Sequence, residues 1–153
     1  LYEPAKILAI YRTTSNKFNS TALDIPFEQT RVINTTFFER LGTTIVVVKI
    51  AGKYKFDLTI NWENNVSNTV KSTWTRLMVN NVINNDVGSM VYSINMGNTK
   101  FTTTAFSYTL DLKVNDQIKV RSLLRLNNGN WNGNFTNISI RNNTALVVEF
   151  LGT

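Results

Sequence analysis

This chain of 153 residues contains no cysteine and no histidine. Without cysteine it can form neither a disulfide bond nor a metal site with thiolate ligands. Without histidine, catalysis by Ser-His-Asp or Cys-His groups and metal binding by imidazole are also excluded. The carboxylates are then the first candidates for a metal site.

Carboxylates are few and lie far apart in the chain, which has 10 Asp and Glu residues. Asp86, Asp111, Asp116 and Glu149 are the candidates for a calcium site, but they lack the spacing of a calcium-binding loop. A carboxylate pair for glycoside hydrolysis would have to come from distant segments. We therefore expect no metal, no cofactor and no enzymatic activity.

Charge and long apolar runs are also scarce. Charged residues make up 17% of the chain, and no apolar run approaches the roughly 20 residues that span a membrane, so we expect no membrane insertion. No signal peptide is visible, and the start at Leu1 suggests a fragment of a longer chain. The net charge of +6 comes from basic residues that are scattered rather than clustered. This pattern favours an ordinary solvated surface, with a mild attraction to anionic cell-surface polymers, over nucleic-acid binding.

Amides and hydroxyls supply most of the polar surface, since the chain has 22 Asn and 20 Thr. Threonine fits pleated strands, whereas asparagine fits turns and tolerates a positive φ angle. Hydrophobic residues make up 42% of the chain, enough for a globular core. Together these counts indicate an all-β domain with many connections.

The clearest strand pattern lies in residues 51–62, where every second residue from Tyr54 to Trp62 is apolar. A period of two places these side chains on one face of a strand. The same pattern recurs in 105–114. Further strands are predicted at 5–13, 23–33, 45–50, 72–85 with a hairpin turn at Asn80-Asn81, 90–96, 117–126, 137–141 and 144–152. Eight to ten short strands without helical periodicity predict one β-sandwich or barrel domain over 1–153.

Several large side chains on these strands are candidates for the core or for an interface between copies of the chain. They are Tyr54, Phe56, Trp74, Tyr108, Leu110 and Phe150. The segments 5–11 and 144–151 are apolar on both faces, more than one sandwich core requires. Either the second face forms an interface between copies, or the monomer buries both faces.

One loop, residues 127–134 with the sequence NNGNWNGN, carries the candidate ligand site. Trp131 can stack on a sugar ring while Asn128, Asn130 and Asn132 supply donors and acceptors to its hydroxyls. The alternative is that Trp131 folds back as a plug over the open end of the sandwich. Trp74 faces away from Leu77 and Val79, so it can lie on the surface, at an interface or against a ligand.

Three segments, in this order, resemble the tumour necrosis factor-like jelly roll, and in particular the globular head of complement component 1 subcomponent q. IVVVKIAGKYKF (45–56) is similar to that family's strand–PxxGxYxF–strand signature. LDLKVNDQIKV (110–120) is similar to its L-x-L-x-x-GD-x-V element, with Asn115 in place of the glycine. NNTALVVEFLG (142–152) is similar to the closing strand of the family.

The resemblance implies a two-sheet antiparallel jelly roll that assembles as a homotrimer. Such domains cap collagen-like stalks and also occur on bacterial filaments and on phage and viral fibres. A chain rich in Asn and Ile and free of Cys is similar to products of AT-rich phage or large-virus genomes. We therefore expect a non-enzymatic trimeric head of a phage or viral fibre or decoration protein on the virion surface. It would serve trimerisation and host-surface attachment.

The partners expected for such a head are further copies of itself, a host cell-surface glycan or protein, or other virion proteins. Two alternative functions remain open. The chain can be a carbohydrate-binding module that uses the 127–134 loop, placed on an extracellular or cell-surface filament. It can also be a purely structural capsid decoration domain that binds no ligand.

Overall fold

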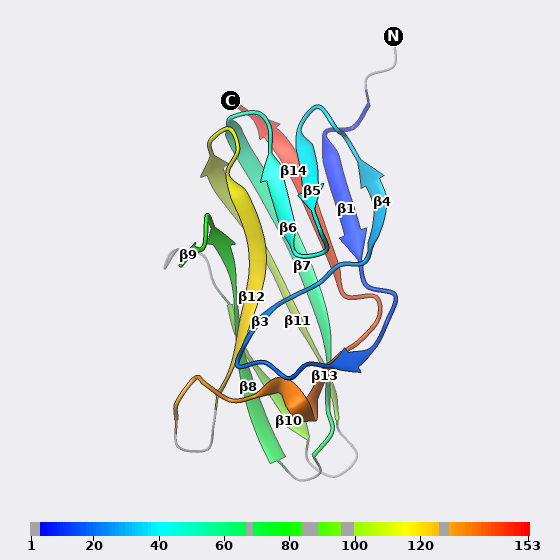
Figure 1. The fold of residues 1–153 in the computed structure, drawn as a ribbon, viewed down its shortest axis with the longest axis vertical. Coiled ribbons are helices and arrows are strands. Elements are labelled where there is room, and N and C mark those ends of the chain that lie inside the picture. The colour runs from blue at the N-terminus through cyan, green and yellow to red at the C-terminus, as the bar shows by residue number, and fades with distance from the viewer. Residues whose placement is uncertain (1–3, 67–68, 84–88, 96–99, 126–128) are drawn as a thin grey trace.

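The computed structural model of the protein describes residues 4–66, 69–83, 89–95, 100–125 and 129–153. These residues form two antiparallel β-sheets that pack face to face (Figure 1). The prediction of a two-sheet antiparallel sandwich is therefore confirmed. In the described part of the chain the only helical element is one short 3₁₀ turn, η1 (Phe135–Asn137).

The first sheet, here named the β7 sheet, has β7 (Gly52–Asn64) at its centre. Its order is β2–β13–β7–β14–β1–β4, with β11 on the other edge of β7. The bounds of these strands are β1 (Ile7–Tyr11), β2 (Asn16–Lys17), β4 (Gln29–Ile33), β11 (Phe101–Leu112), β13 (Ile138–Ile140) and β14 (Ala145–Gly152). The first and last long strands of the chain thus pair with each other next to the central strand.

The second sheet, here named the β12 sheet, has β12 (Gln117–Arg125) at its centre. Its order is β10–β8–β12–β6–β5, with β3 on β12 and β9 on β8. The bounds of these strands are β3 (Ala22–Asp24), β5 (Phe38–Leu41), β6 (Ile45–Val48), β8 (Thr69–Val79), β9 (Val82–Ile83) and β10 (Ser89–Asn95).

The predicted strand at 51–62 is the central strand of the β7 sheet. Its alternate residues from Tyr54 to Trp62 are at most 2% exposed, so they form the middle of the core. The structure corrects one boundary, because the predicted strand ended at residue 62. Strand β7 continues to Asn64, since β11 pairs with it as far as Phe101↔Glu63. A complete ladder along this edge keeps the polar end of β7 in strand conformation.

Aromatic residues fill the core at both ends of β7. Near one end the Trp62 ring stacks on Phe135 of η1 at 6.0 Å, and its indole N–H donates to Thr104 Oγ1 at 2.8 Å. Near the other end Tyr54 contacts Phe38 and Phe150 edge to face. Its hydroxyl donates to the Ile50 carbonyl at 2.6 Å. Burial raises the pKa of Tyr54, although this hydrogen bond opposes the shift.

Asparagine turns connect the strands as the sequence predicts. Asn80 and Asn81 have φ angles of 54° and 63°, which join β8 to β9. Asn115 has a φ of 70° between β11 and β12, and Asn143 has a φ of 64° before β14. Asparagine tolerates this left-handed region better than most residues, which explains why it occupies these turns.

Segment 23–33 was expected to be one irregular strand around Pro26. The structure divides it into β3 in the β12 sheet and β4 in the β7 sheet. Proline has no N–H for a sheet ladder, and here it lies where the chain crosses from one sheet to the other. No strand was predicted between residues 33 and 45, but Phe38–Leu41 forms β5 against β6.

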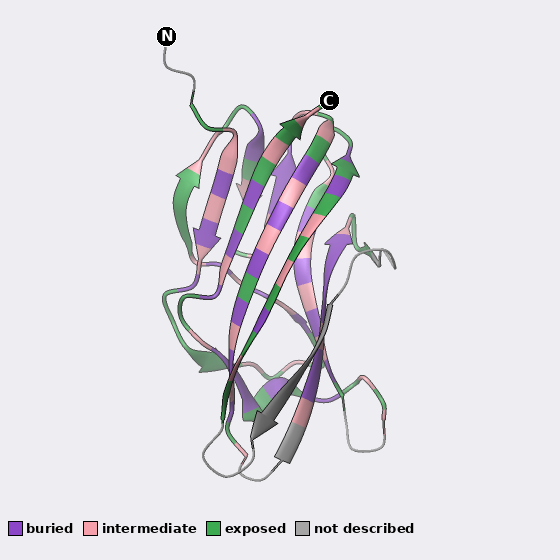
Figure 2. Cartoon of the chain, turned by 180° about the vertical axis from the view of Figure 1, so that it is seen from behind, coloured by how far each residue is buried: buried purple, intermediate pink, exposed green. Residues whose placement is uncertain are grey.

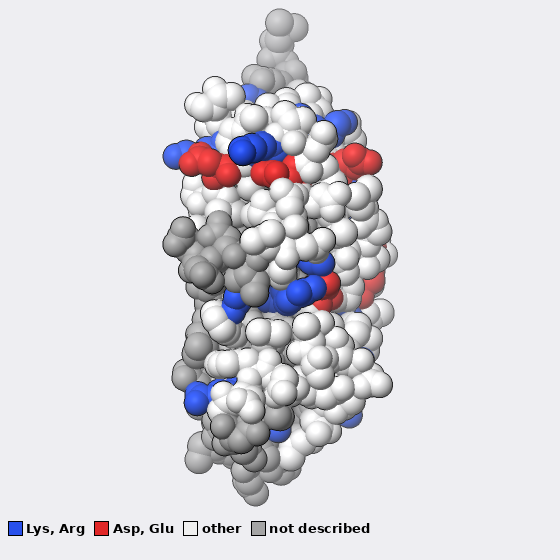
Figure 3. All heavy atoms as spheres, turned by 60° about the vertical axis from the view of Figure 1, so that its left-hand side comes forward, with Lys and Arg blue, Asp and Glu red and all other residues white. Residues whose placement is uncertain are grey.

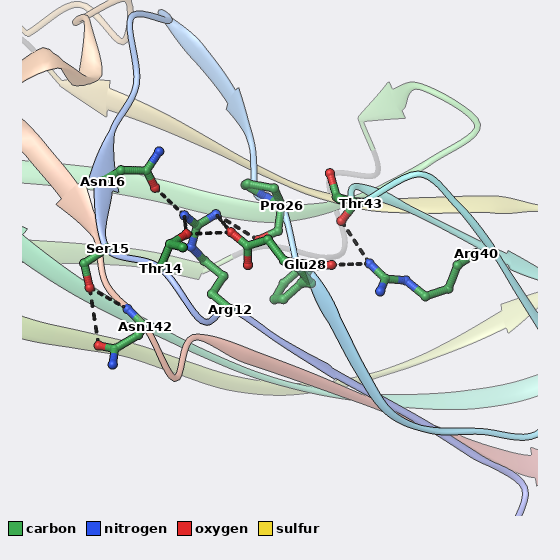
Figure 4. Close-up of polar contacts among 10 residues, drawn as sticks. Arg12, Thr14, Ser15, Asn16, Pro26, Glu28, Arg40, Thr43 and Asn142 are labelled. Atoms are coloured by element: carbon green, nitrogen blue, oxygen red, sulfur yellow. Dashed lines mark hydrogen bonds and ion pairs between the residues drawn. The ribbon is translucent and has the colours of Figure 1, made fainter.

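The buried Arg12 fastens the end of β1 to this crossing segment (Figure 4). Its guanidinium donates to the Pro26 carbonyl at 3.0 Å and to Thr14 Oγ1 at 3.2 Å. It also donates to Asn16 Oδ1 and forms an ion pair with Glu28 at 3.2 Å. Burial lowers the pKa of Arg12, and the charge of Glu28 opposes that shift. These partners give Arg12 a structural role and explain why it can be buried.

In the residues that the structure describes, no helix is both long and apolar enough to span a membrane.

Candidate functional site

The 129–133 part of the loop that carries Trp131 is fixed to the edge of the β12 sheet. The Gly133 N–H donates to the Leu124 carbonyl at 2.9 Å, and the two residues form an isolated β-bridge. A Cβ atom at Gly133 would lie 3.0 Å from that carbonyl oxygen and 3.1 Å from Leu124 side-chain carbons. Glycine therefore allows the close approach that holds the loop against β12.

Further along, the chain is fixed by the turn before η1. Asn134 accepts a hydrogen bond from the Thr136 N–H, and the Phe135 N–H donates to the Ser20 carbonyl. Phe135, and not Trp131, enters the core at this end of the sandwich. Trp131 is held outside, so the alternative of a plug is wrong for Trp131.

The half-buried rings of Trp131 and Trp74 meet on the outer face of the β12 sheet. Their centroids are 5.7 Å apart and their planes make an angle of 63°, an edge-to-face contact. Trp74 belongs to the outer parity of β8, because Thr73, Thr75 and Leu77 face the core. These two tryptophans are 57 positions apart in sequence, and the register Leu123↔Trp74 brings them together.

Arg76, two residues after Trp74 on the same face, stacks on the Trp74 ring with its guanidinium carbon 3.4 Å from the centroid. The residue is only 5% exposed, and its Nε atom is buried without a hydrogen-bond partner. Within the described parts of the chain Arg76 forms no hydrogen bond and no ion pair. Burial lowers the pKa of Arg76.

The cations next to Arg76 both pair with Asp24 of β3. Arg121, the cross-strand neighbour of Arg76, donates to Asp24 at 2.8 Å, and Lys119 lies 3.3 Å from the same carboxylate. Burial by itself would raise the pKa of Asp24, but Arg121 and Lys119 outweigh it and lower that pKa. Figure 3 shows the side of the molecule on which β9 and β12 lie in Figure 1, with basic and acidic side chains adjoining across its middle.

A fourth side chain completes the group. The guanidinium carbon of Arg125, an exposed residue at the end of β12, lies 5.8 Å from the centroid of the Trp131 ring. Trp74, Arg76, Arg125 and Trp131 are named the Trp–Arg cluster below. Sequence reasoning singled out both tryptophans but missed both arginines. The available signal was that Arg76 shares the outward parity of Trp74.

The other predicted ligand residues lie in the same loop, but their role stays a prediction. Asn130 and Asn132 are exposed, whereas Asn128 lies outside the described residues. Of the candidates for core or interface, Tyr54, Phe56 and Leu110 are buried in the core. Tyr108 and Phe150 are half-buried and pack against that core from its edge.

The predicted carboxylates do not meet. Asp116 accepts hydrogen bonds from Asn80 and from the Lys113 N–H, so it stabilises the turn before β12. Asp111 and Glu149 are exposed on β11 and β14, and Asp86 lies outside the described residues. Among the side chains that can be described, no group of three or more Asp and Glu residues is placed to hold a metal ion.

The outer face of the β7 sheet has a different chemistry. Figure 2 views this face and shows half-buried and exposed residues alternating with buried ones along its strands. One cross-strand row runs through β4, β1, β14, β7 and β11, and it consists of Val32, Ala9, Val147, Asp57 and Ser107. The next row consists of Tyr11, Ala145, Thr59 and Ala105. Most of these side chains are small or apolar.

A shallow hollow lies in the β1–β14 half of this face. It is lined by Ala9, Ile10, Tyr11, Arg31, Asn143, Ala145 and Val147. The guanidinium carbon of Arg31 lies 4.8 Å from the centroid of the Tyr11 ring. Val147 is 36% exposed and Val32 is 45% exposed, so apolar surface remains uncovered in one copy of the chain. The chain therefore does not bury both faces of its terminal strands.

No family model and no curated protein matches the sequence. Solved structures do match the fold. The crystal structure of murine APRIL at pH 5.0 has a TM-score of 0.61 and 11% identity, covering 97% of this chain and 100% of that one. The crystal structure of murine APRIL at pH 8.5 has a TM-score of 0.57 and 12% identity, covering 95% and 98%.

At this level of identity the likeness concerns the fold alone. It agrees with the strand order found here, in which β1, β14, β7 and β11 form one sheet and β6, β12, β8 and β10 form the other. The closer resemblance to the head of complement component 1 subcomponent q stays a prediction. The chain has the tumour necrosis factor-like jelly-roll fold.

Proposed function

We propose that the chain is a non-enzymatic head domain that assembles as a homotrimer through the outer face of the β7 sheet. The observation that carries this proposal is the composition of that face. Its central rows hold small and apolar side chains, and Val32, Val147 and Leu151 are 45%, 36% and 48% exposed. Uncovered apolar surface of this kind on a stable sheet is typical of an interaction site.

The two halves of the face differ, which suits a ring of copies. The β4–β1–β14 half is apolar and hollowed, whereas β11 presents the small or hydroxyl-bearing side chains of Thr103, Ala105, Ser107 and Thr109. A cyclic trimer joins two different patches, whereas a two-fold dimer joins one patch to itself. The number three comes from the resemblance to the tumour necrosis factor-like jelly roll.

Charges on this face are also suited to contact with another copy. Lys55 and Asp57 lie side by side on β7 at 3.8 Å, and Glu149 is the cross-strand neighbour of Lys55. Both signs are present in similar number next to the apolar rows. A second copy can therefore approach without a large surplus of one charge.

The biological setting belongs to the same proposal. The head would end a phage or viral fibre, or decorate a capsid, at the virion surface and serve host attachment. Attachment requires a surface that remains open in the trimer, and the outer face of the β12 sheet is on the opposite side of the sandwich (Figure 1). A structural decoration protein would need no such site.

The test is the mass of the protein in solution at micromolar concentration by analytical ultracentrifugation. The proposal predicts a species of three times the 17.4 kDa chain mass. A monomer or a dimer over the whole concentration range would overturn it.

A further inference from the structure

We propose that the Trp–Arg cluster binds an acidic sugar, with the carboxylate on Arg76 and the sugar ring on Trp131. N-Acetylneuraminic acid is the representative ligand. This proposal rests on the attachment role proposed above and names its ligand class. The site itself lies within one chain, so it does not require the trimer.

Arg76 has no polar partner in the part of the chain that the structure describes. The relative exposure of Arg76 is only 5%, yet among the described residues it has no hydrogen-bond or ion-pair partner. Arginine rarely loses its hydration without a partner, because an uncompensated charge away from water is costly. Stacking on Trp74 uses only the face of the guanidinium, since its N–H donors all lie in its plane. A carboxylate can accept two of these donors side by side.

The contrast with Arg12 supports this assignment. Arg12 is 1% exposed and has Pro26, Thr14, Asn16 and Glu28 as partners. The fold thus supplies carbonyls, amides and a carboxylate where it buries an arginine for structural reasons. Among the described residues it supplies only an aromatic face to Arg76.

The neighbouring cations are less suited than Arg76 to bind the carboxylate of a ligand. Arg121 and Lys119 both pair with the single carboxylate of Asp24, so each already has an ion-pair partner within the protein. Arg125 is exposed beside the Trp131 ring and adds a second positive charge near the ring-binding surface. An anion at this face therefore meets Arg76, which is buried, and Arg125, which is exposed, and neither has an ion-pair partner among the described residues.

The geometry of the two tryptophans favours a sugar over a nucleic-acid base as the ligand. An angle of 63° between the rings leaves no parallel slot for a flat base. The half-exposed Trp131 instead offers an indole surface to the C–H groups of a sugar ring. Asn132, exposed in the same loop, can donate to and accept from sugar hydroxyls.

The experiment titrates the intact chain with 3′-sialyllactose and with lactose, which differ by the acidic sugar, at 0.15 M NaCl and pH 7. Binding is followed by calorimetry and by tryptophan fluorescence. We expect affinity for 3′-sialyllactose to exceed that for lactose by at least about tenfold, the effect of one charged hydrogen-bonded pair. Arg76→Gln should remove this preference, and Trp131→Ala should weaken the binding of 3′-sialyllactose.

Arg31→Gln is the matched control, because Arg31 also stacks on an aromatic ring but lies on the β7 sheet, and it should leave the affinity unchanged. The proposal is overturned by equal affinity for the two sugars, or by an unchanged preference in Arg76→Gln. It is also overturned if inorganic sulfate or a single-stranded oligonucleotide binds and 3′-sialyllactose does not. Circular dichroism checks that each variant folds. If Arg76→Gln does not fold, Trp131→Ala tests the site in its place.

The mass of each sample is measured as well, so that the two proposals fail separately. A trimer that binds no acidic sugar leaves the proposed assembly intact and overturns this inference. A monomer that binds 3′-sialyllactose overturns the proposed assembly and leaves this inference intact.

Discussion

The outer faces of the two sheets in this sandwich carry different side chains. The β7 sheet presents small and apolar residues such as Ala9, Ala145 and Val147, with charges of both signs nearby. The β12 sheet presents two tryptophans in contact and arginines beside them. A surface of the first kind suits packing against another protein copy, and one of the second kind suits an anionic ligand with a stackable ring. One domain can therefore use opposite sides for assembly and for ligand binding.

The largest expected effect comes from placing a charge on the face proposed for assembly. Val147→Lys should weaken self-association by roughly 100-fold or more, because the interface would bury an ammonium group. The monomer should still fold, since Val147 is 36% exposed and its neighbour Asp57 can pair with the lysine. Sedimentation across a concentration series measures the change.

Val114→Lys is the control for this substitution. Val114 is 55% exposed in the turn between β11 and β12, away from the proposed interface. Its substitution should leave the mass unchanged. Equal loss of assembly in both variants would mean that added charge, and not the position, weakens association.

The second prediction compares the two buried arginines. Arg12→Met should lower the free energy of unfolding by about 3 kcal/mol, because it leaves Glu28 and the Pro26 carbonyl without their cation. Arg76→Met should change it by less than about 1 kcal/mol, because among the described residues Arg76 has only its stacking contact on Trp74 to lose. Urea unfolding at one fixed protein concentration measures both.

If Arg76→Met destabilised the protein as much as Arg12→Met, Arg76 would be a structural residue. Its proposed role in ligand binding would then lose its main support.

The third prediction concerns the glycine that holds the Trp131 loop. Gly133→Ala should cost about 1–2 kcal/mol of stability, because its Cβ atom would lie 3.0 Å from the Leu124 carbonyl oxygen. The loop would shift, and the near-ultraviolet circular dichroism of the tryptophan pair should decrease. Asn132→Ala, an exposed position in the same loop, should change neither quantity. An unaltered spectrum for Gly133→Ala would show that the bridge to Leu124 does not position Trp131.

The smallest expected effect is the change in folding stability as the pH is lowered. The pKa of Asp24 is lowered in the folded state, so its interaction with Arg121 and Lys119 stabilises the protein above the unfolded pKa and is lost as pH falls through the folded pKa. Relative to Asp24→Asn, the wild type should be more stable by up to about 1 kcal/mol at pH 6. This advantage should shrink below about pH 4. A difference that stays constant from pH 6 to pH 2 would contradict the ion pair.

Local chemistry explains which parts of the fold were predictable from sequence. Alternation over nine residues predicted the burial of Tyr54 and Trp62, and asparagine chemistry predicted the turns at Asn80 and Asn115. The pattern missed β2 and β5, which have two and four residues, and it merged β3, which has three, with β4. So short a strand contains too few alternations to show a period, and its conformation depends on its partners.

The candidate site was only half predictable for a related reason. The composition of its loop marked Trp131, but its contact with Trp74 depends on strand register and on the bridge between Leu124 and Gly133. Arg76 had the sequence pattern of an ordinary solvated strand residue. That it has no polar partner among the described residues emerges only from the three-dimensional surroundings of its guanidinium.

The separation of the two faces can be tested by one affinity, that of Val147→Lys for 3′-sialyllactose, at a concentration where this variant sediments as a monomer. If assembly and binding use opposite faces, the monomer should bind with an affinity within about twofold of wild type, since the Trp–Arg cluster lies within one chain. Loss of binding together with loss of assembly, in a variant that remains folded, would contradict the account and place the ligand site between copies.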